Sequence, residues 1–557
     1  MLPHPFAPFR IRPGDPIAEA EALAARTLGA PLVVDPAEPG SPRLAPTALG
    51  RVAAGSASDQ EAACRGADGR LSGTVGHERA CPNSTVHRER VAAAGRSLLE
   101  AGYAGVLLDR PDLVLGLGLF GAGFCEPCQA AFQAGLRDEY GTQLDPFDFR
   151  RIAADELATA PGAVSFRKLH FGRDFWRFRL DSLPEAIAAY ALPVRDAART
   201  ARRDFSVVGR FEQVGPAQFQ AARLLDAAVF PLSPPGHHSG GAAGRLWRAA
   251  VGRRPVAAQL PGGAAPAQVA RWAAALAGSG VAVGMEEGER AAVVEPLRRL
   301  LAEHAGRRDG RPFEDPVAEC LAFYSPDADV WSSGLHRLEL EEVGETLSRL
   351  GVQWEVATGG SRLRPGAVLV LPQAIGLHPV EATAITRFLE SGGKVLVLGE
   401  ARAAGPGGRM LPPFLPEAKV GRTKATRAGG GSILALPPLV PEPSGGAAAP
   451  ASEPVGRALA ALSGRGRPAV QVVSPTPLSV SAFRPSRRLD VHVSASGEGP
   501  VRGATLVIAS EHAGSARRAR FRGAGGLDEK IALVPSAGEV AAVLPEFQGY
   551  GVLSLVP

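Results

Sequence analysis

The stretch that decides the fold begins at Cys81-Pro82-Asn83-Ser84 and ends at Tyr140-Gly141. Near its middle lies the apolar run Gly105-Val106-Leu107-Leu108-Asp109, which is typical of a buried strand that ends in a carboxylate. A glycine-rich turn leads from this strand to Phe124-Cys125-Glu126-Pro127-Cys128. Two thiols therefore share one short loop, and a third, Cys81, precedes the helix that leads into the strand.

The same alternation extends outward over residues from about 8 to 305, where short apolar strands are followed by amphipathic helices. One strand has to lie within the Gly- and Pro-rich region 36–80, and the other seven are expected at 9–11, 31–35, 106–109, 206–212, 227–232, 256–260 and 281–285. Eight strand–helix units in about 300 residues fit a (β/α)8 barrel. We expect this barrel to occupy residues 1–312.

Three further segments follow the predicted barrel. Residues 313–400 restart the strand–helix alternation and predict a small doubly wound α/β domain. Its cysteine, Cys320, begins a strand rather than a strand-to-helix elbow, so we expect a structural domain. Residues 401–469 are rich in Gly, Pro and Ala and predict loops or a linker, and residues 470–557 predict a β-sandwich of short alternating strands.

The composition excludes several classes of protein. The formal charge of +5 comes from 61 basic and 56 acidic residues, and the arginines are scattered among acids, so no nucleic-acid footprint is expected. No stretch approaches the ~20 apolar residues of a membrane span. Five cysteines give no disulfide framework, which favours a reducing, cytoplasmic setting.

The order of CPNS, a strand ending in Asp109, a CxxC loop, Ala131-Phe132 and Tyr140-Gly141 resembles the glycoside hydrolase family 42 β-galactosidases and related glycosidase barrels. The segment from Phe388 to Val395 is similar to the amidotransferase-like trimerisation domain that follows the barrel in that family. The resemblance implies a homotrimeric hydrolase that acts on a carbohydrate through two carboxylates, without an organic cofactor.

The cysteines form a candidate metal site. A CxxC pair has the bite that chelates tetrahedral Zn²⁺, and in the family a CPNS-type cysteine and a CxCxxC loop bind one structural zinc. Cys81, Cys125 and Cys128 match three of those positions, but Gly123 stands at the fourth. Cys64 or His77 would complete the shell. Reduced, unligated thiols and a redox pair stay open as alternatives.

The first candidate catalytic acid is Asp109, because polar side chains at the carboxyl end of barrel strands are the usual catalytic groups. The family has an Asn-Glu pair there, whereas this chain has Asp109-Arg110-Pro111-Asp112, so Asp109 or Asp112 would take the role. The alternative is that Asp109 pairs with Arg110 or caps the next turn.

A second carboxylate is required, and the family supplies it from a Glu at the end of strand seven. Here that strand ends at Gln259, which cannot attack an anomeric carbon. Glu212 and Glu286 are the other acids at strand ends. The alternative for Glu212 is a solvated loop acid, and the alternative for Glu286 is a charged helix start.

Four residues near these acids are candidate substrate contacts, namely Arg210, His237, His238 and Gln259. Histidines in a glycine-rich loop more often have no such role. Two functions therefore stand open: a glycoside hydrolase acting on an oligosaccharide, and a catalytically degenerate carbohydrate-binding or scaffold protein on the same frame. The absence of the Asn-Glu pair and the presence of Gln259 favour the second.

Overall fold

The structure is a computed structural model. It describes residues 10–12, 33–35, 44–47, 51–52, 57–74, 77–101, 103, 105–112, 121–141, 147–159, 171–232, 241–252, 254–260, 264–283, 294–297, 299–300, 316–332, 334–359, 363–364, 366–405, 409–415, 425–440, 452–464, 468–484, 488–495 and 499–556.

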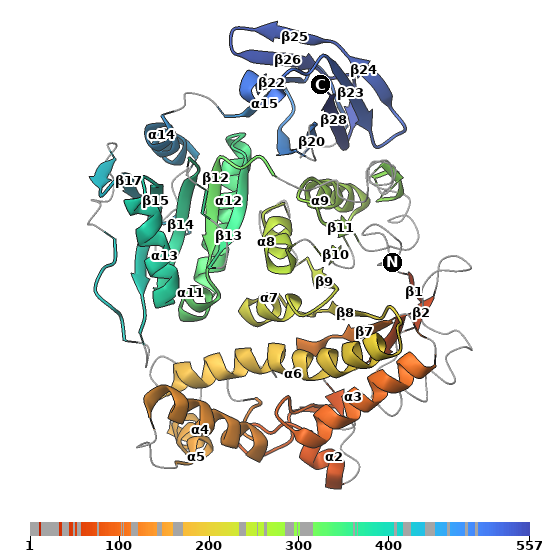
Figure 1. Cartoon of the computed structure of the whole chain (residues 1–557), viewed down its shortest axis with the longest axis vertical. Coiled ribbons are helices and arrows are strands. Elements are labelled where there is room, and N and C mark those ends of the chain that lie inside the picture. Colours follow the sequence, from red (N-terminus) through yellow and green to blue (C-terminus); the bar gives the residue numbers. More distant parts are fainter. Residues whose placement is uncertain are drawn as a thin grey trace.

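The N-terminal part is built on a six-stranded sheet in which each strand pairs in parallel with the next one along the chain (Figure 1). Its strands, in order, are β3 (Leu44–Thr47), β7 (Gly105–Asp109), β8 (Ser206–Arg210), β9 (Ala227–Pro231), β10 (Val256–Gln259) and β11 (Ala282–Val283). The helices of this part are α2 (Ala57–Ala62), α3 (Thr85–Glu100), α4 (Glu126–Tyr140), α5 (Phe149–Thr159), α6 (Gly172–Thr200), α7 (Pro216–Ala222), α8 (Gly241–Val251) and α9 (Pro266–Gly278). Among the described residues, none of these or the later helices combines the length and apolar character of a membrane span.

The strand expected within residues 36–80 is β3, and it joins the sheet beside β7. The two strands expected before it differ from the prediction. β1 (Arg10–Arg12) and β2 (Val33–Asp35) pair with each other in antiparallel fashion, whereas barrel strands would be parallel. Barrel closure therefore stays a prediction. A small antiparallel sheet of β4 (Arg51–Val52), β6 (His77–Arg79) and β5 (Gly73–Thr74) lies ahead of α3.

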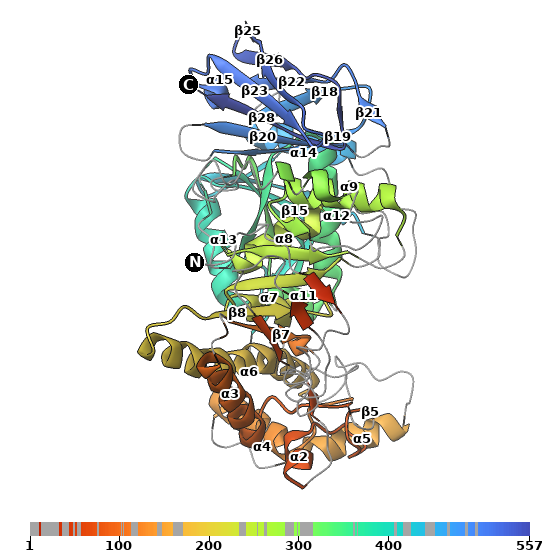
Figure 2. The same cartoon turned by 90° about the vertical axis from the view of Figure 1, so that its right-hand side faces the viewer.

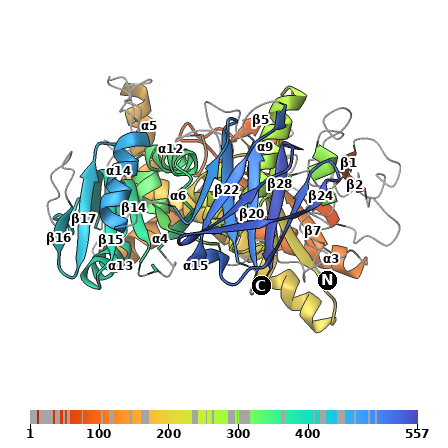
Figure 3. The ribbon, with the colours of Figure 1, turned by 90° about the horizontal axis from the view of Figure 1, so that it is seen from above.

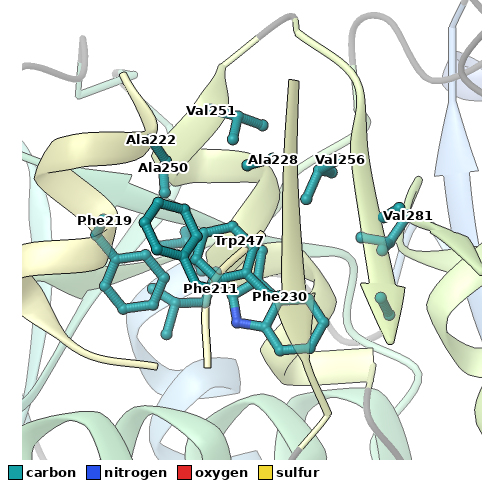
Figure 4. Packing of buried hydrophobic residues seen from close by; sticks show 14 of the residues in the cluster. Phe211, Phe219, Ala222, Ala228, Phe230, Trp247, Ala250, Val251, Val256 and Val281 are labelled. Atoms are coloured by element: carbon teal, nitrogen blue, oxygen red, sulfur yellow. The ribbon is translucent and has the colours of Figure 1, made fainter. Parts of the chain in front are cut away.

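Aromatic side chains fill the space between the parallel sheet and the helices that follow its strands (Figure 4). Phe230 of β9 stacks on Phe211 with ring centroids 5.1 Å apart and on Trp247 of α8 at 5.4 Å. Phe219 of α7 approaches the same ring at 5.9 Å. Trp272 of α9 is also buried, as its place on an amphipathic helix predicts. These contacts fix α7 and α8 against the sheet.

The second sheet is parallel except at one edge, with strand order β13-β12-β14-β15-β17-β16. Its strands are β12 (Cys320–Tyr324), β13 (Trp354–Thr358), β14 (Val368–Leu377), β15 (Lys394–Ala403), β16 (Thr426–Ala428) and β17 (Gly431–Leu436), and its helices are α11 (Pro326–Trp331), α12 (Leu335–Arg349), α13 (Pro379–Glu390) and α14 (Ser452–Ser463). Alternate residues of β12 belong to different apolar clusters: Ala322 to the cluster that includes residues of α12 and α14, and Phe323 to the one that includes residues of α13. The strand order, in which β12 lies between β13 and β14, is that of a doubly wound sheet. Cys320 is buried at the start of β12, and burial raises the pKa of its thiol.

The segment expected as loops or a linker, 401–469, instead completes this sheet. β17 pairs in parallel with β15, β16 pairs with β17 in antiparallel fashion, and α14 packs on the sheet. The Gly429-Gly430-Gly431 run is the turn between β16 and β17. Gly429 has φ +58°, and a Cβ at Gly431 would lie 2.2 Å from the carbonyl oxygen of Gly393. Glycine here permits a tight turn and a close backbone approach, not flexibility.

The C-terminal strands form two antiparallel sheets that enclose a separate apolar core (Figures 2 and 3). One sheet has the order β18-β22-β26-β25 and the other β19-β20-β28-β23-β24. The strands are β18 (Val470–Val473), β19 (Leu478–Phe483), β20 (Leu489–Ala495), β22 (Thr505–Ala509), β23 (Arg518–Gly523), β24 (Asp528–Ile531), β25 (Leu533–Ser536), β26 (Glu539–Val543) and β28 (Tyr550–Val556), with β21 (Pro500–Val501) and β27 (Phe547–Gln548) as a small extra pair and α15 (Ser510–Ala513) after β22.

A buried charge network joins the three parts. Arg245 on α8 donates hydrogen bonds to Glu355 Oε1 on β13 at 3.2 Å and to Ser481 Oγ on β19 at 2.6 Å. Arg248, one turn along α8, pairs with the other oxygen of Glu355 and lies over the ring of Phe483 at 5.2 Å. Burial lowers the pKa of Arg245 to about 10, so the guanidinium is still charged at neutral pH.

We predict that Glu355→Gln destabilises the whole chain, because two buried guanidinium groups lose their carboxylate. Breaking one partner of a buried pair costs about 3–5 kcal/mol. The matched control is Glu453→Gln, since Glu453 pairs with Arg457 in solvent and such pairs contribute about 0–1 kcal/mol. Urea unfolding followed by circular dichroism measures both. Equal midpoints for the two variants would contradict the central role of the network.

Candidate active edge and cysteine cluster

The carboxyl ends of β7 and β8 lie side by side and carry the first candidate residues. Asp109 is the register partner of Arg210, and Arg110 N donates to Arg210 O at 2.7 Å. Phe211 N donates to Val229 O of β9 at 2.9 Å, so the three strand ends form one edge. Asp109 is placed here by its backbone, and its side chain lies outside the described residues.

An ion pair between neighbouring strand ends marks this edge. Arg110 Nη1 lies 3.8 Å from Glu212 Oε1, and the two side chains are 31% and 44% exposed. Arg110 has φ +47°, a left-handed conformation that non-glycine residues rarely adopt. Such backbone conformations are held by their surroundings and cluster at functional sites. The sequence pointed to Glu212 but not to this pairing, because the partners are about a hundred residues apart.

Asp112 has a different position from the one expected of a catalytic acid. It is buried, and its carboxylate accepts hydrogen bonds from Glu212 N at 3.0 Å, Gln213 N at 2.8 Å and Gln218 Nε2 at 3.3 Å. Burial raises the pKa of this carboxyl, and the hydrogen bonds oppose that shift. Asp112 therefore holds the loop after β8 and positions Glu212, rather than facing a ligand.

Of the other candidate residues near this edge, the structure describes Gln259 and Arg210. Gln259 is exposed at the end of β10, and its carbonyl oxygen accepts a hydrogen bond from Leu232 N at 2.8 Å. Arg210 is half-buried at the end of β8. His237, His238 and Glu286 lie outside the described residues. The edge thus brings together Asp109, Arg210, Glu212 and Gln259 of the residues that the sequence singled out.

The four candidate cysteine ligands converge in a separate cluster, and all of their sulfur atoms lie within 4.8 Å of one another. Cys81 Sγ is 3.2 Å from Cys125 Sγ and 3.5 Å from Cys128 Sγ, and Cys64 Sγ is 3.9 Å from Cys125 Sγ. A tetrahedron with Zn–S bonds of about 2.3 Å has S–S edges of about 3.8 Å. The four thiols therefore fit a tetrahedral metal ion.

Local structure brings the four thiols together. Ser84 of the CPNS motif caps α3 by accepting from His87 N at 3.3 Å, which places Cys81 just before the helix. Cys125 is the residue before α4, and Cys128 lies in its first turn. Backbone pairing holds Cys64 beside Cys81. An antiparallel bridge joins Ala63 to Ala80, and Cys81 N donates to Ala62 O at 2.7 Å.

Of the two expected fourth ligands, Cys64 is the one whose side chain the structure describes, and it lies in the cluster. Gly123 has φ +95°, and a Cβ at that position would lie 2.4 Å from Cδ of the buried Arg179, so no cysteine side chain fits there. Gly123 N instead donates to Cys64 Sγ at 3.0 Å. His77 lies in β6, and its side chain is outside the described residues.

Two features favour a thiolate in this cluster. Hydrogen bonding from Cys125, Cys128 and Cys81 lowers the pKa of Cys64, while the bonds inside the cluster raise the pKa of Cys81 and Cys128, so the negative charge is favoured on Cys64. Asn83 Nδ2, which the sequence did not single out, donates to Cys128 Sγ at 3.4 Å, and Arg88 Nη2 donates to Asn83 Oδ1 at 3.2 Å. Thiolates are the metal-binding form of cysteine, and such outer contacts orient ligands.

Comparisons with known proteins identify the fold. No family model matches the chain, and no curated protein matches it. Among solved structures, a β-galactosidase from Bacillus circulans sp. alkalophilus is 13% identical, with 89% of this chain and 86% of that chain covered and a TM-score of 0.59. A catalytic variant of a glycoside hydrolase family 42 β-galactosidase from G. stearothermophilus is also 13% identical, with 89% of this chain and 85% of that chain covered and a TM-score of 0.60. α-L-Fucosidase isoenzyme 2 from Paenibacillus thiaminolyticus is 13% identical, with 92% of this chain and 86% of that chain covered and a TM-score of 0.58. The chain shares the fold of these three solved structures.

We predict that Asp112→Asn lowers the melting temperature while Glu212→Gln leaves it unchanged. Asparagine keeps one acceptor oxygen and turns an NH₂ group toward backbone N–H donors, which leaves buried donors unpaired at a cost of about 1–3 kcal/mol. Glu212 is half-exposed, and its ion pair contributes about 0–1 kcal/mol. Differential scanning fluorimetry measures both. A stable Asp112→Asn variant would contradict the positioning role.

Proposed function

We propose that the protein binds a carbohydrate at the carboxyl edge of β7, β8 and β10 and hydrolyses a glycosidic bond there. The observation that carries the proposal is the clustering of Asp109, the Arg110–Glu212 ion pair and Arg210 at the carboxyl edge of a parallel sheet. Active sites of α/β folds lie at that edge. The solved structures of similar fold include β-galactosidases and an α-L-fucosidase, and the shared fold supports a glycoside as the ligand.

The proposed chemistry uses two carboxylates. Glycosidases need one carboxylic acid that protonates the leaving oxygen and one carboxylate that attacks the anomeric carbon or activates water. Asp109 and Glu212 come from adjacent strands and serve as this pair in the proposal. Arg210 and Gln259 would donate hydrogen bonds to sugar hydroxyl groups, and Asp112 keeps the Glu212 loop in place.

A second candidate function is binding without hydrolysis, and Gln259 favours it. The family resemblance puts a nucleophilic glutamate at the end of this strand, and an amide can neither attack nor accept the proton. In this reading the same edge recognises a sugar and leaves it intact.

The finer features of the family resemblance belong to the same proposal. They are closure of the parallel sheet into a (β/α)8 barrel, trimerisation through the domain at 313–400, and a cytoplasmic location. The sequential strand order from β3 to β11 supports the barrel. The doubly wound sheet that follows supports the amidotransferase-like character of the second domain.

We also propose that Cys64, Cys81, Cys125 and Cys128 hold one structural zinc ion. The carrying observation is the convergence of four buried sulfur atoms with spacings close to a tetrahedral edge. A four-thiolate zinc site has no open position, so the ion would fasten the loop before α3 to the start of α4 and take no part in hydrolysis.

For zinc, we predict about one equivalent per purified chain, lost in Cys64→Ser together with a lower melting temperature. Cys320→Ala is the matched control, because Cys320 is buried far from the cluster in sequence and should keep the metal. Elemental mass spectrometry and differential scanning fluorimetry give the two readouts. Metal-free protein in which all five cysteines titrate as thiols after unfolding would favour unligated cysteines, and a mass lower by about two hydrogens would favour a redox pair.

For catalysis, we predict turnover of at least one aryl glycoside in a panel, reduced by about two orders of magnitude or more in Asp109→Asn and in Glu212→Gln. Glu546→Gln, which alters an exposed ion pair with Arg502, should keep full activity. Turnover that survives both substitutions would place the carboxylates elsewhere. Sugar binding without turnover by the wild type would establish the second candidate function.

A further inference from the structure

A zinc ion bound by the four cysteines would leave a net negative charge inside the protein. Four thiolates exceed the charge of one Zn²⁺ ion by two negative charges, and all four cysteines are buried. A charge held away from water is costly unless a group of opposite sign lies close to it. The residues packed around the cluster therefore affect how tightly it holds a metal ion.

One face of α6 forms a wall of the cysteine cluster. Phe178 packs against the cysteines, and Arg179, the next residue, is 2% exposed. Ser182 accepts a hydrogen bond from Asn83 Nδ2 at 3.4 Å, and the same nitrogen donates to Cys128 Sγ at 3.4 Å. Side chains three and four residues apart lie on one side of a helix, so these groups of α6 face the cluster together.

Arg179 brings a positive charge to this wall, and Gly123 contacts both Arg179 and Cys64. A Cβ at Gly123 would lie 2.4 Å from Cδ of Arg179, 2.6 Å from Nε and 3.0 Å from Cζ, so the arginine packs directly on the glycine. The N–H of the same glycine donates to Cys64 Sγ at 3.0 Å. Hydrogen bonds from the other cysteines lower the pKa of Cys64 most, and the positive charge of Arg179 adds to that effect. The guanidinium is thus close enough for its charge to act on the cluster.

We propose that Arg179 balances the charge of the metal-bound thiolates and thereby raises the affinity of the cluster for zinc. The inference rests on the zinc site proposed above and concerns a residue that is not itself a ligand. A guanidinium stays protonated at neutral pH, so it offsets one of the two excess negative charges. Removing an outer contact of a metal site typically weakens metal binding by about 10–100-fold.

The test separates the charge of Arg179 from the space that its side chain fills. Arg179→Met keeps an unbranched stem beside Gly123 and removes the charge, whereas Arg179→Lys keeps both a stem and a charge. Titration of the zinc-loaded chain with a chromophoric chelator gives the zinc affinity of each variant. We expect about tenfold weaker zinc binding in Arg179→Met and an affinity within about threefold of the wild type in Arg179→Lys.

Arg195→Met is the matched control. Arg195 lies on the same helix, about 24 Å further along, and pairs with Asp226 at 3.0 Å. It should keep the wild-type affinity for zinc. Cobalt(II) in place of zinc gives a thiolate-to-metal charge-transfer absorption, which checks that the cysteines still bind the metal in every variant. Arg179→Gln, which is also neutral, takes the place of Arg179→Met if the methionine variant does not fold.

The outcomes distinguish the role of Arg179 from the zinc site itself. Weaker zinc binding in Arg179→Met, with near wild-type binding in Arg179→Lys, supports the charge role. Equal affinities in the two variants, whether unchanged or reduced, overturn that role and leave the zinc site standing. A wild-type chain that holds no zinc overturns the zinc site and the role of Arg179 together, and it leaves hydrolysis at Glu212 unaffected.

Discussion

The arrangement of the chain depends on Arg245, Arg248 and Glu355, the charged groups that meet where the three parts of the molecule join. Each charge was taken out of water, so the network tolerates little displacement of α8, β13 or β19. Gln353 reinforces the same junction, because its Nε2 donates to Val480 O at 3.4 Å and its Oε1 accepts from Ala482 N at 2.8 Å. Polar groups that must pair across a domain boundary fix the relative position of the two domains. Because α7 and α8 pack on the first sheet, the same constraint applies to the carboxyl edge of that sheet.

Much of this architecture could be predicted from hydrophobic patterns. The strands at 105–109, 206–210, 227–231 and 256–259 are short apolar runs bounded by polar residues, and buried parallel strands leave that signature. The strand at 431–436 was missed for a physical reason. Its glycines look like a linker in sequence, whereas their role is to let two backbones approach within van der Waals distance at the turn. Composition cannot distinguish these two uses of glycine.

The candidate sites show the same division. The CxxC loop and the CPNS motif are short local patterns, so they can be recognised in the sequence. Cys64 lies in the cluster because of β-pairing near Ala63 and Ala80, and the spacing of the cysteines does not predict that pairing. For Asp112, the role expected from the sequence differs from the contacts that the side chain makes. An acid near a strand end reads as catalytic, yet its hydrogen bonds run to backbone amides about a hundred residues away. Sequence proximity places a side chain at an edge, and only the surrounding donors decide whether it faces a ligand.

The geometry at Gly123 explains why the fourth sulfur atom of the cluster does not come from position 123. Arg179 of α6 occupies the space that a side chain at position 123 would need, so a ligand there and this arginine exclude each other. Cys64 supplies the fourth sulfur from another direction, and the N–H of Gly123 then donates to it. The zinc ion proposed above would join the start of α4 to the segment before α3 through these four sulfur atoms, and it would stabilise the fold without taking part in bond cleavage.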